Sequence, residues 1–188
     1  MSATSIHREK RMTTADRVAK VAEIIAAEPD EAWLIWCDTD YEADALNSAI
    51  ADAVEVRGSQ IAEIKERKLE SFSTGQAKRL ITKPSVAGYG LNWQHCARVA
   101  FVGLSFSYES YYQAVRRCYR FGQTRPVHVH VVSSDTEAAI GQAIARKAGD
   151  HDAMKREMTA AMRRAARIER ELLSYTPNKK AAFPAWLS

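Results

Sequence analysis

One stretch of this sequence has residue types and a spacing suited to binding an anion: "YYQAVRRCYRFGQTRP", residues 111–126. It holds four arginines within ten residues, and no carboxylate: Arg116, Arg117, Arg120 and Arg125. At about 100° per helical residue, Gln113, Arg117 and Arg120 would share one exposed face of a helix that Gly122 ends. Guanidinium groups grip phosphate or carboxylate bidentately and stay charged at any cellular pH. The spacing predicts an oxyanion-binding face, although an ordinary solvated basic face fits it equally well.

A glycine-bearing loop, "KPSVAGYGLN" (residues 83–92), precedes that stretch. Gly88 and Gly90 lack a Cβ atom, so the loop can bring its backbone amides against a phosphate. Ser85 and Asn92 could donate further hydrogen bonds to the same kind of group. From these residues alone, an ordinary glycine turn between a strand and a helix is the preferred alternative.

The elements that must position these residues alternate between strands and helices. Apolar runs predict strands over residues 32–37, 54–58, 77–82, 98–104 and 126–132, and apolar residues at helical spacing predict helices over 14–28, 41–53 and 61–72. Strands separated by helices of this length indicate a parallel α/β sheet wound by crossover helices. The run "AWLIWC" is typical of a strand buried on both faces, which makes Trp33 and Trp36 core residues. Beyond residue 133 only helical periodicity remains.

Composition limits the function classes. The chain has 188 residues, a hydrophobic fraction of 46%, a net charge of +4 and no apolar run long enough for a membrane span, which fits one domain with an appendage. The N-terminal segment lacks the apolar run of a secretory signal, and three cysteines without a CxxC pair suit a reducing compartment, so we expect a cytoplasmic location. His128 and His130 alternate with valines and most simply face one side of the sheet, so no metal site is predicted.

The arginine stretch and the glycine loop both resemble motifs of one protein family. "QAVRRCYRFGQ" is similar to motif VI of superfamily 2 helicases and translocases, QxxxRxxRxGQ, in the form found in the Swi/Snf-like branch and in related phage-type DEAD/DEAH-like helicases. "ITKPSVAGYGLN" resembles motif V of that branch. The matching residues are Ser85, Gly88, Gly90, Leu91 and Asn92.

Three further segments extend the resemblance in the family's order. "WLIWCDTDYEADAL" is similar to the motif IV strand and helix, "VRGSQ…EIKERKLESF" to the segment between motifs IV and V, and "SSDTEAAI" to the element after the last strand. The resemblance covers residues 14–145. It implies a flexible tail over residues 1–13, a RecA-like helicase C-terminal domain over 14–148, and a helical extension with a tail over 149–188.

The resemblance also implies a mechanism. In this family ATP and Mg²⁺ lie between two RecA-like lobes, and the C-terminal lobe reaches the γ-phosphate across the cleft. By that comparison Arg120 is the arginine finger, Arg117 is its companion, and Gln113 contacts the nucleotide or the other lobe. Gly88 and Gly90 would lie near the nucleotide. Ser85, Asn92 and Arg116 would contact nucleic acid, DNA rather than RNA by the branch resembled.

The chain departs from the family pattern in three respects. Arg116 occupies a position that is usually glycine, and Gly103 and Leu104 stand where an acidic residue is common. Neither a GxxxxGK[ST] loop nor a DExx-type box occurs in these residues, so the chain is expected to need a separate N-terminal lobe for turnover. A free-standing RecA-like module that binds nucleic acid or a helicase stays an alternative. An unrelated enzyme has no support, because the sequence has no dinucleotide fingerprint and no nucleophile elbow.

Overall fold

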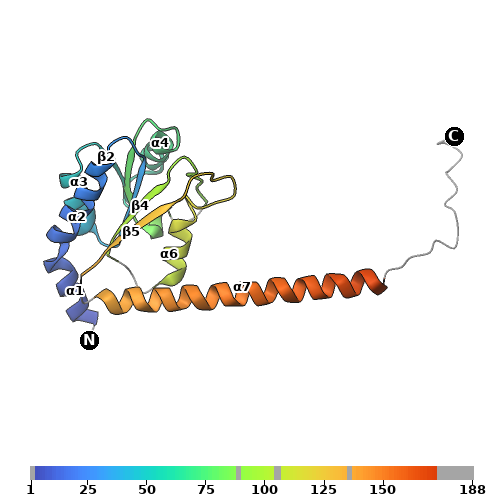
Figure 1. Cartoon of the computed structure of the whole chain (residues 1–188). Helices are drawn as coiled ribbons and strands as arrows, with labels where there is room; N and C mark the ends of the chain where they lie inside the picture. Colours follow the sequence, from blue (N-terminus) through green and yellow to red (C-terminus); the bar gives the residue numbers. More distant parts are fainter. Residues whose placement is uncertain (1–2, 88–89, 104–106, 135–136, 173–188) are drawn as a thin grey trace, which may run out of the picture. The chain divides into compact units, whose positions relative to one another are not determined.

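The computed structural model describes residues 3–87, 90–103, 107–134 and 137–172, and five of its segments form one sheet (Figure 1). The strands are β1 (Trp33–Cys37), β2 (Ala53–Val56), β3 (Arg79–Thr82), β4 (Arg98–Val102) and β5 (His128–Val132). Their order across the sheet is β2-β3-β1-β4-β5, and every pairing is parallel. The predicted fold, a parallel sheet wound by helices, is confirmed.

Helices cover both faces of this sheet. The helices are α1 (Ala3–Met12), α2 (Thr14–Ala27), α3 (Asp40–Ala49), α4 (Ala62–Ser73), α5 (Pro84–Ala87), α6 (Tyr108–Val115) and α7 (Ala138–Leu172). Helices α2 and α3 pack on one face, and α4, α5, α6 and the first turns of α7 supply the core of the other. In Figure 1, α2 and α3 accordingly lie on one side of the strands and α6 on the other.

The central strand β1 contributes to both halves of the core. Leu34 and Trp36 point into the α4–α6 side, whereas Trp33 and Ile35 point into the α2–α3 side. All five residues of β1 are buried, as the continuous apolar run predicted. Trp93 joins the same core, with its ring 6.4 Å from that of Trp36. Trp33, Trp36 and Trp93 are therefore core residues.

Two helix boundaries and one terminal segment differ from the sequence-based expectation. Helix α3 starts earlier than predicted, because Thr39 and Glu42 form a reciprocal capping box, and it ends at Ala49, since Ala53 already belongs to β2. Residues 3–12, expected to be part of a flexible tail, instead form α1. In this helix Lys10 is buried and donates to Asp38, a partly buried contact with a residue far along the chain that the local sequence does not reveal.

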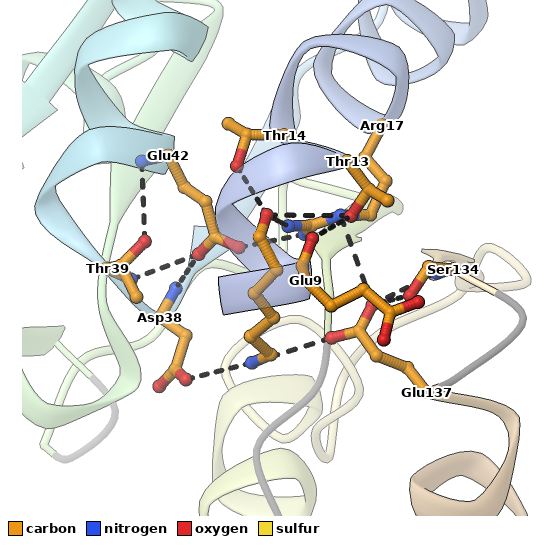
Figure 2. A network of polar contacts seen from close by, with 10 residues as sticks. Glu9, Thr13, Thr14, Arg17, Asp38, Thr39, Glu42, Ser134 and Glu137 are labelled. Atoms are coloured by element: carbon orange, nitrogen blue, oxygen red, sulfur yellow. Dashed lines mark hydrogen bonds and ion pairs between the residues drawn. The ribbon is translucent and has the colours of Figure 1, made fainter. Parts of the chain in front are cut away.

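The carboxyl ends of β1, β4 and β5 meet a network of buried charges (Figure 2). The Arg17 side chain is 3% exposed, and its guanidinium donates to Glu42 at 2.8 Å and to the Lys10 carbonyl at 2.6 Å. Glu137, 2% exposed, lies 3.5 Å from the Lys10 ammonium and 3.9 Å from Arg17. A second Glu42 oxygen accepts from the backbone amide of Asp38. The network thus joins α1, α2, α3 and the turn that leads into α7.

Gly103, which directly follows β4, makes room for this network. Its φ is +77°, and a Cβ atom there would lie 2.7 Å from Arg17 Nη1 and 3.0 Å from Glu137 Oε1. Any side chain at this position would therefore have to displace Arg17 or Glu137. Glu42 and Glu137 supply the carboxylates beside Arg17.

The chain divides into two units, Met1–Lys147 and Ala148–Ser188, so the boundary falls within α7. Among the described helices, none is both long enough and apolar enough to cross a membrane.

A comparison of two glycines tests the role of Gly103. Gly75 has the same φ of +77° but nothing within 4 Å of its would-be Cβ, so Gly75→Ala reports backbone strain alone. We expect Gly75→Ala to lower the free energy of unfolding by about 1 kcal/mol, and Gly103→Ala to lower it by about 1–3 kcal/mol more, because the added methyl displaces Arg17 from Glu42. Urea unfolding of both variants measures the difference. Equal losses would mean that the network tolerates a side chain at Gly103.

Candidate functional site

The predicted arginine helix is shorter than expected. Helix α6 begins after Ser107, whose Oγ accepts from the Ser110 amide at 3.1 Å, and it ends at Val115 rather than near Gly122. Beyond Val115 the chain tightens into turns, and the carbonyl of Arg117 accepts from the Trp93 amide at 2.9 Å. The Arg117 amide donates to the carbonyl of Ala114 at 3.3 Å rather than to that of Gln113, which accepts from Arg117 Nε instead. The prediction that Arg117 and Arg120 extend one helical face is therefore wrong.

Arg117 is buried, which corrects the expectation that it projects from an exposed face. Its side chain is 7% exposed. Nη1 donates to the carbonyl of Leu91 at 2.9 Å, Nε donates to the carbonyl of Gln113 at 3.1 Å, and Nη2 lies 3.3 Å from Gln113 Oε1. Arg117 thus fastens the end of α6 to the segment that follows the glycine loop.

Arg120 is exposed, and its side chain makes no hydrogen bond or ion pair with any residue in the described ranges. It borders an open pocket of about 390 Å³. The lining residues are Gly90, Tyr112, Gln113, Arg116, Arg117 and Arg120. None of the six is acidic, and the guanidinium of Arg116 lies 5.8 Å from the centre of the Tyr112 ring. Three guanidinium groups around one hollow can hold a multiply charged oxyanion.

The structure therefore brings Gly90, from the glycine loop, together with the predicted residues Gln113, Arg116, Arg117 and Arg120. Gly90 is exposed and has a φ of +78°. Gly88, the other predicted glycine, lies outside the described residues.

The turn that carries Arg120 is held by two glutamines that the sequence analysis did not single out. Gln123 Nε2 donates to the carbonyl of Gln94 at 2.8 Å, and Gln94 Nε2 donates to the carbonyl of Phe121 at 2.6 Å. Gly122, with a φ of +93°, leaves space for the Gln94 side chain, which would lie 3.1 Å from a Cβ atom there. These hydrogen bonds hold the backbone of the turn that carries Arg120, whereas the Arg120 side chain has no partner among the described residues.

The predicted nucleic-acid residues Ser85 and Asn92 are exposed and do not line the arginine pocket. Ser85 borders a second pocket of about 280 Å³, where β1, β2 and β3 end. Lys83, Arg57 and Ser59 line it too. These residues were not predicted, although each follows a strand end of a parallel sheet, which is where such folds usually bind ligands.

The two cations of this second pocket, Lys83 and Arg57, already form ion pairs. Lys83 Nζ lies 2.8 Å from Asp40 Oδ1, and this hydrogen bond lowers the pKa of the Asp40 carboxyl. Arg57 pairs with Glu55 and Asp44, which raises the pKa of its guanidinium. The pocket is lined by hydroxyl groups, two cations and two carboxylates, Asp40 and Glu55, so a phosphate would have to replace the carboxylates as partners of Lys83 and Arg57.

Cys37 and Cys118 do not add a nucleophile. Burial raises the pKa of Cys37 to about 12, and a hydrogen bond with Cys96 together with burial raises that of Cys118. Both thiols therefore stay protonated at neutral pH. Within the part of the chain that the structure describes, no group of three or more His, Cys, Asp or Glu side chains could hold a metal ion.

Comparison with known proteins agrees with this geometry. Residues 16–122 match the family model described as "Helicase conserved C-terminal domain". A search of curated protein sequences gave no match.

Solved structures share the fold at low identity. The chain is similar to the C-terminal part of the Fun30 ATPase domain, with 19% identity and a TM-score of 0.61 over 68% of this chain and 44% of that one. It is similar to the C-terminal domain of the DEAD-box protein Dbp5, with 20% identity and a TM-score of 0.62 over 72% of this chain and 80% of that one. A variant of Dbp5 from S. cerevisiae bound to RNA and ADP BeF3 matches at 20% identity and a TM-score of 0.63, over 71% of this chain and 36% of that one. The chain thus spans less than half of the Fun30 fragment.

The different burial of two arginines gives a stability prediction. We expect Arg117→Ala to lower the free energy of unfolding by about 2–3 kcal/mol, because it leaves the Leu91 carbonyl and the Gln113 amide oxygen without their charged donor. Arg120→Ala is the matched control and should stay within about 0.5 kcal/mol of the unchanged chain. Urea unfolding of the isolated chain measures both. Equal unfolding midpoints would contradict a structural role for Arg117.

Proposed function

Since the chain belongs to the helicase conserved C-terminal domain family, as the C-terminal lobe of a superfamily 2 helicase, we propose that it supplies the arginine finger to ATP hydrolysis by a nucleic-acid-dependent motor. A separate N-terminal RecA-like lobe, in the same or another polypeptide, would bind the nucleotide. The observation that carries the proposal is Arg120: an exposed guanidinium without a partner among the described residues, on a fixed turn, beside a hollow lined by two more arginines.

The arginine pocket fits the polyphosphate part of such a nucleotide and does not fit its Mg²⁺. Its six lining residues include three guanidinium groups and no carboxylate. When bound, Mg²⁺ would neutralise phosphate charge from the N-terminal lobe. On this side of the cleft, Arg120 would donate to the oxygens of the transferring γ-phosphoryl group, an effect worth about 10³–10⁵ in rate for arginine fingers.

The contacts of Arg117 support a different role for this residue from the one implied by the family resemblance. Its guanidinium donates to the Leu91 and Gln113 carbonyls and lies against the Gln113 side chain, so it acts as a positioning residue that ties the glycine loop to the arginine turn. We propose that Gln113 and Gly90 complete the nucleotide side of the pocket. A shift of the glycine loop would then be transmitted to the turn that carries Arg120 through the buried guanidinium of Arg117.

The second pocket is our candidate contact with nucleic acid. Lys83, Ser85, Arg57 and Ser59 present positive charge and hydroxyl donors at neighbouring strand ends, which suits backbone phosphates. Asn92 and Arg116 would extend the contact. The Dbp5 structure that holds RNA and the Fun30 ATPase domain are both structural neighbours, and we propose DNA first because the motif sequences resemble the Swi/Snf-like branch.

The first test is ATP hydrolysis in the presence of a lobe that carries a phosphate loop, either the upstream part of the same polypeptide or a neighbouring gene product. Arg120→Ala should lower kcat by at least about 10³-fold. Arg120→Lys should restore little, because an ammonium group lacks the planar fork, and Arg116→Ala should reduce turnover less. The chain alone should not hydrolyse ATP. Normal turnover by Arg120→Ala would exclude the finger assignment, and hydrolysis by the isolated chain would exclude the two-lobe reading.

The second test is nucleic-acid binding by the isolated chain at several salt concentrations. Affinity should fall as salt rises, and Lys83→Ala should weaken binding and reduce the slope of log affinity against log salt by about one. Lys20→Ala is the control, because Lys20 is exposed and pairs only locally with Glu23. Single- and double-stranded DNA and RNA are compared in parallel. If Lys83→Ala and Lys20→Ala behave alike, the second pocket does not bind the strand.

A further inference from the structure

Within the unit that begins at Ala148, helix α7 carries a stripe of exposed apolar side chains. From Met154 to Arg164 every residue is exposed. The stripe includes three large side chains: Met154 is 57%, Met158 54% and Met162 63% exposed. Helices in proteins owe most of their stability to packing of an amphipathic face, so a helix of this length with an exposed stripe needs a partner.

The spacing of the stripe is that of a coiled coil. His151, Met154, Met158 and Ala161 alternate by three and four residues, which places them at successive a and d positions of a heptad repeat. In the sequence, the same alternation continues to Ala165, Ile168 and Leu172. A stripe with this period follows a neighbouring helix along its whole length, rather than touching a globular surface at one point.

We propose that residues 148–172 of α7 pair with the same helix of a second copy of this chain, as a parallel, in-register coiled coil. The inference goes beyond the motor function and does not depend on it. Methionine at a and d suits such a seam moderately well, since its flexible side chain fills irregular gaps, and Met162 at an e position widens the apolar contact.

The charges beside the stripe favour this partner. In a parallel dimer each g position meets the following e position of the other helix. Asp150 is a g residue and Lys155 is the e residue five positions on, so the two copies would form this pair of opposite charges twice. Arg156 and Arg163 fall at f positions, which point away from the seam, whereas Arg164 falls at a g position, for which the e residue five positions on in the sequence is Glu169.

Sedimentation equilibrium of the full chain tests the proposal. The unchanged chain should dimerise, and Met158→Lys, which puts a charge at an a position of both helices, should weaken the dimer at least about tenfold. Thr159→Lys is the matched control: it adds the same side chain one residue away on the outward face, and should change the dissociation constant less than about twofold. Thermal melts verify that both variants keep the α/β domain folded.

Two further variants test the orientation. Asp150→Lys and Lys155→Asp should each weaken the dimer, and the double exchange should restore it, because only the exchange returns opposite charges to facing positions. Ala161→Cys should form an intermolecular disulfide readily under a mild oxidant such as diamide, while the natural cysteines stay unreacted, since all three are buried. Thr159→Cys should crosslink poorly.

Each contrary result overturns the proposal. A chain that stays monomeric at high concentration would show that another occupant covers the stripe, and loss of nucleic-acid binding by Met158→Lys in such a monomer would identify that occupant. If Met158→Lys does not weaken the dimer, the dimer interface lies elsewhere on the chain. A dimer with no crosslink at Ala161→Cys and no charge rescue would be antiparallel or out of register.

Discussion

The burial of the Arg17 guanidinium is the constraint on which the arrangement of the α/β domain depends most directly. A charge at 3% exposure is tolerable only beside opposite charge and with its donors occupied, and removing one partner of such a pair usually destabilises a protein by about 3–5 kcal/mol. Its partners come from separate segments: Glu42 at the start of α3, Glu137 before α7 and the carbonyl of Lys10 in α1. Satisfying one guanidinium therefore fixes three segments at the carboxyl edge of the sheet, and Gly103 is the residue that leaves the necessary space.

Arg117 and Arg120 lie three positions apart in sequence, yet one has a structural role and the other is exposed as the proposed finger. Arg117 is buried and donates to oxygens of its own chain, so these hydrogen bonds contribute to the free energy of folding. Arg120 is exposed, and no described residue of the turn that carries it accepts a hydrogen bond from its guanidinium. A sequence pattern that places both arginines in one motif cannot assign these roles. The roles differ because a residue from another segment, Leu91, accepts a hydrogen bond from Arg117.

The sequence predicted the parts of the fold that local patterns determine. All five strands, their separation by helices and the double burial of β1 follow from apolar runs and periodicity, and the family resemblance follows from motifs whose order matches. The errors lie where distant residues decide. Helix α6 ends at Val115, beyond which Arg117 donates to the Leu91 carbonyl and its own carbonyl accepts from the Trp93 amide, and residues 3–12 form α1, in which Lys10 contacts Asp38 and Glu137. At the site, the arginine cluster and Gly90 could be predicted. The lysine and arginine beside Ser85 were missed because they converge only once the strand ends are aligned.

The way Arg120 is held bears on what an arginine finger needs. A donor lowers a barrier most when its dipole is oriented before the charge develops, so that no free energy is used to reorganise it during the reaction. Here the orientation of the backbone is fixed during folding: Gln123 and Gln94 bond across the turn, and Gly122 adopts a left-handed conformation that accommodates Gln94. Those contacts are complete within this chain, whereas the Arg120 side chain has no partner among the described residues. Under the proposed function, folding therefore fixes only the backbone beneath Arg120, and the side chain is oriented when closure brings the phosphate to it.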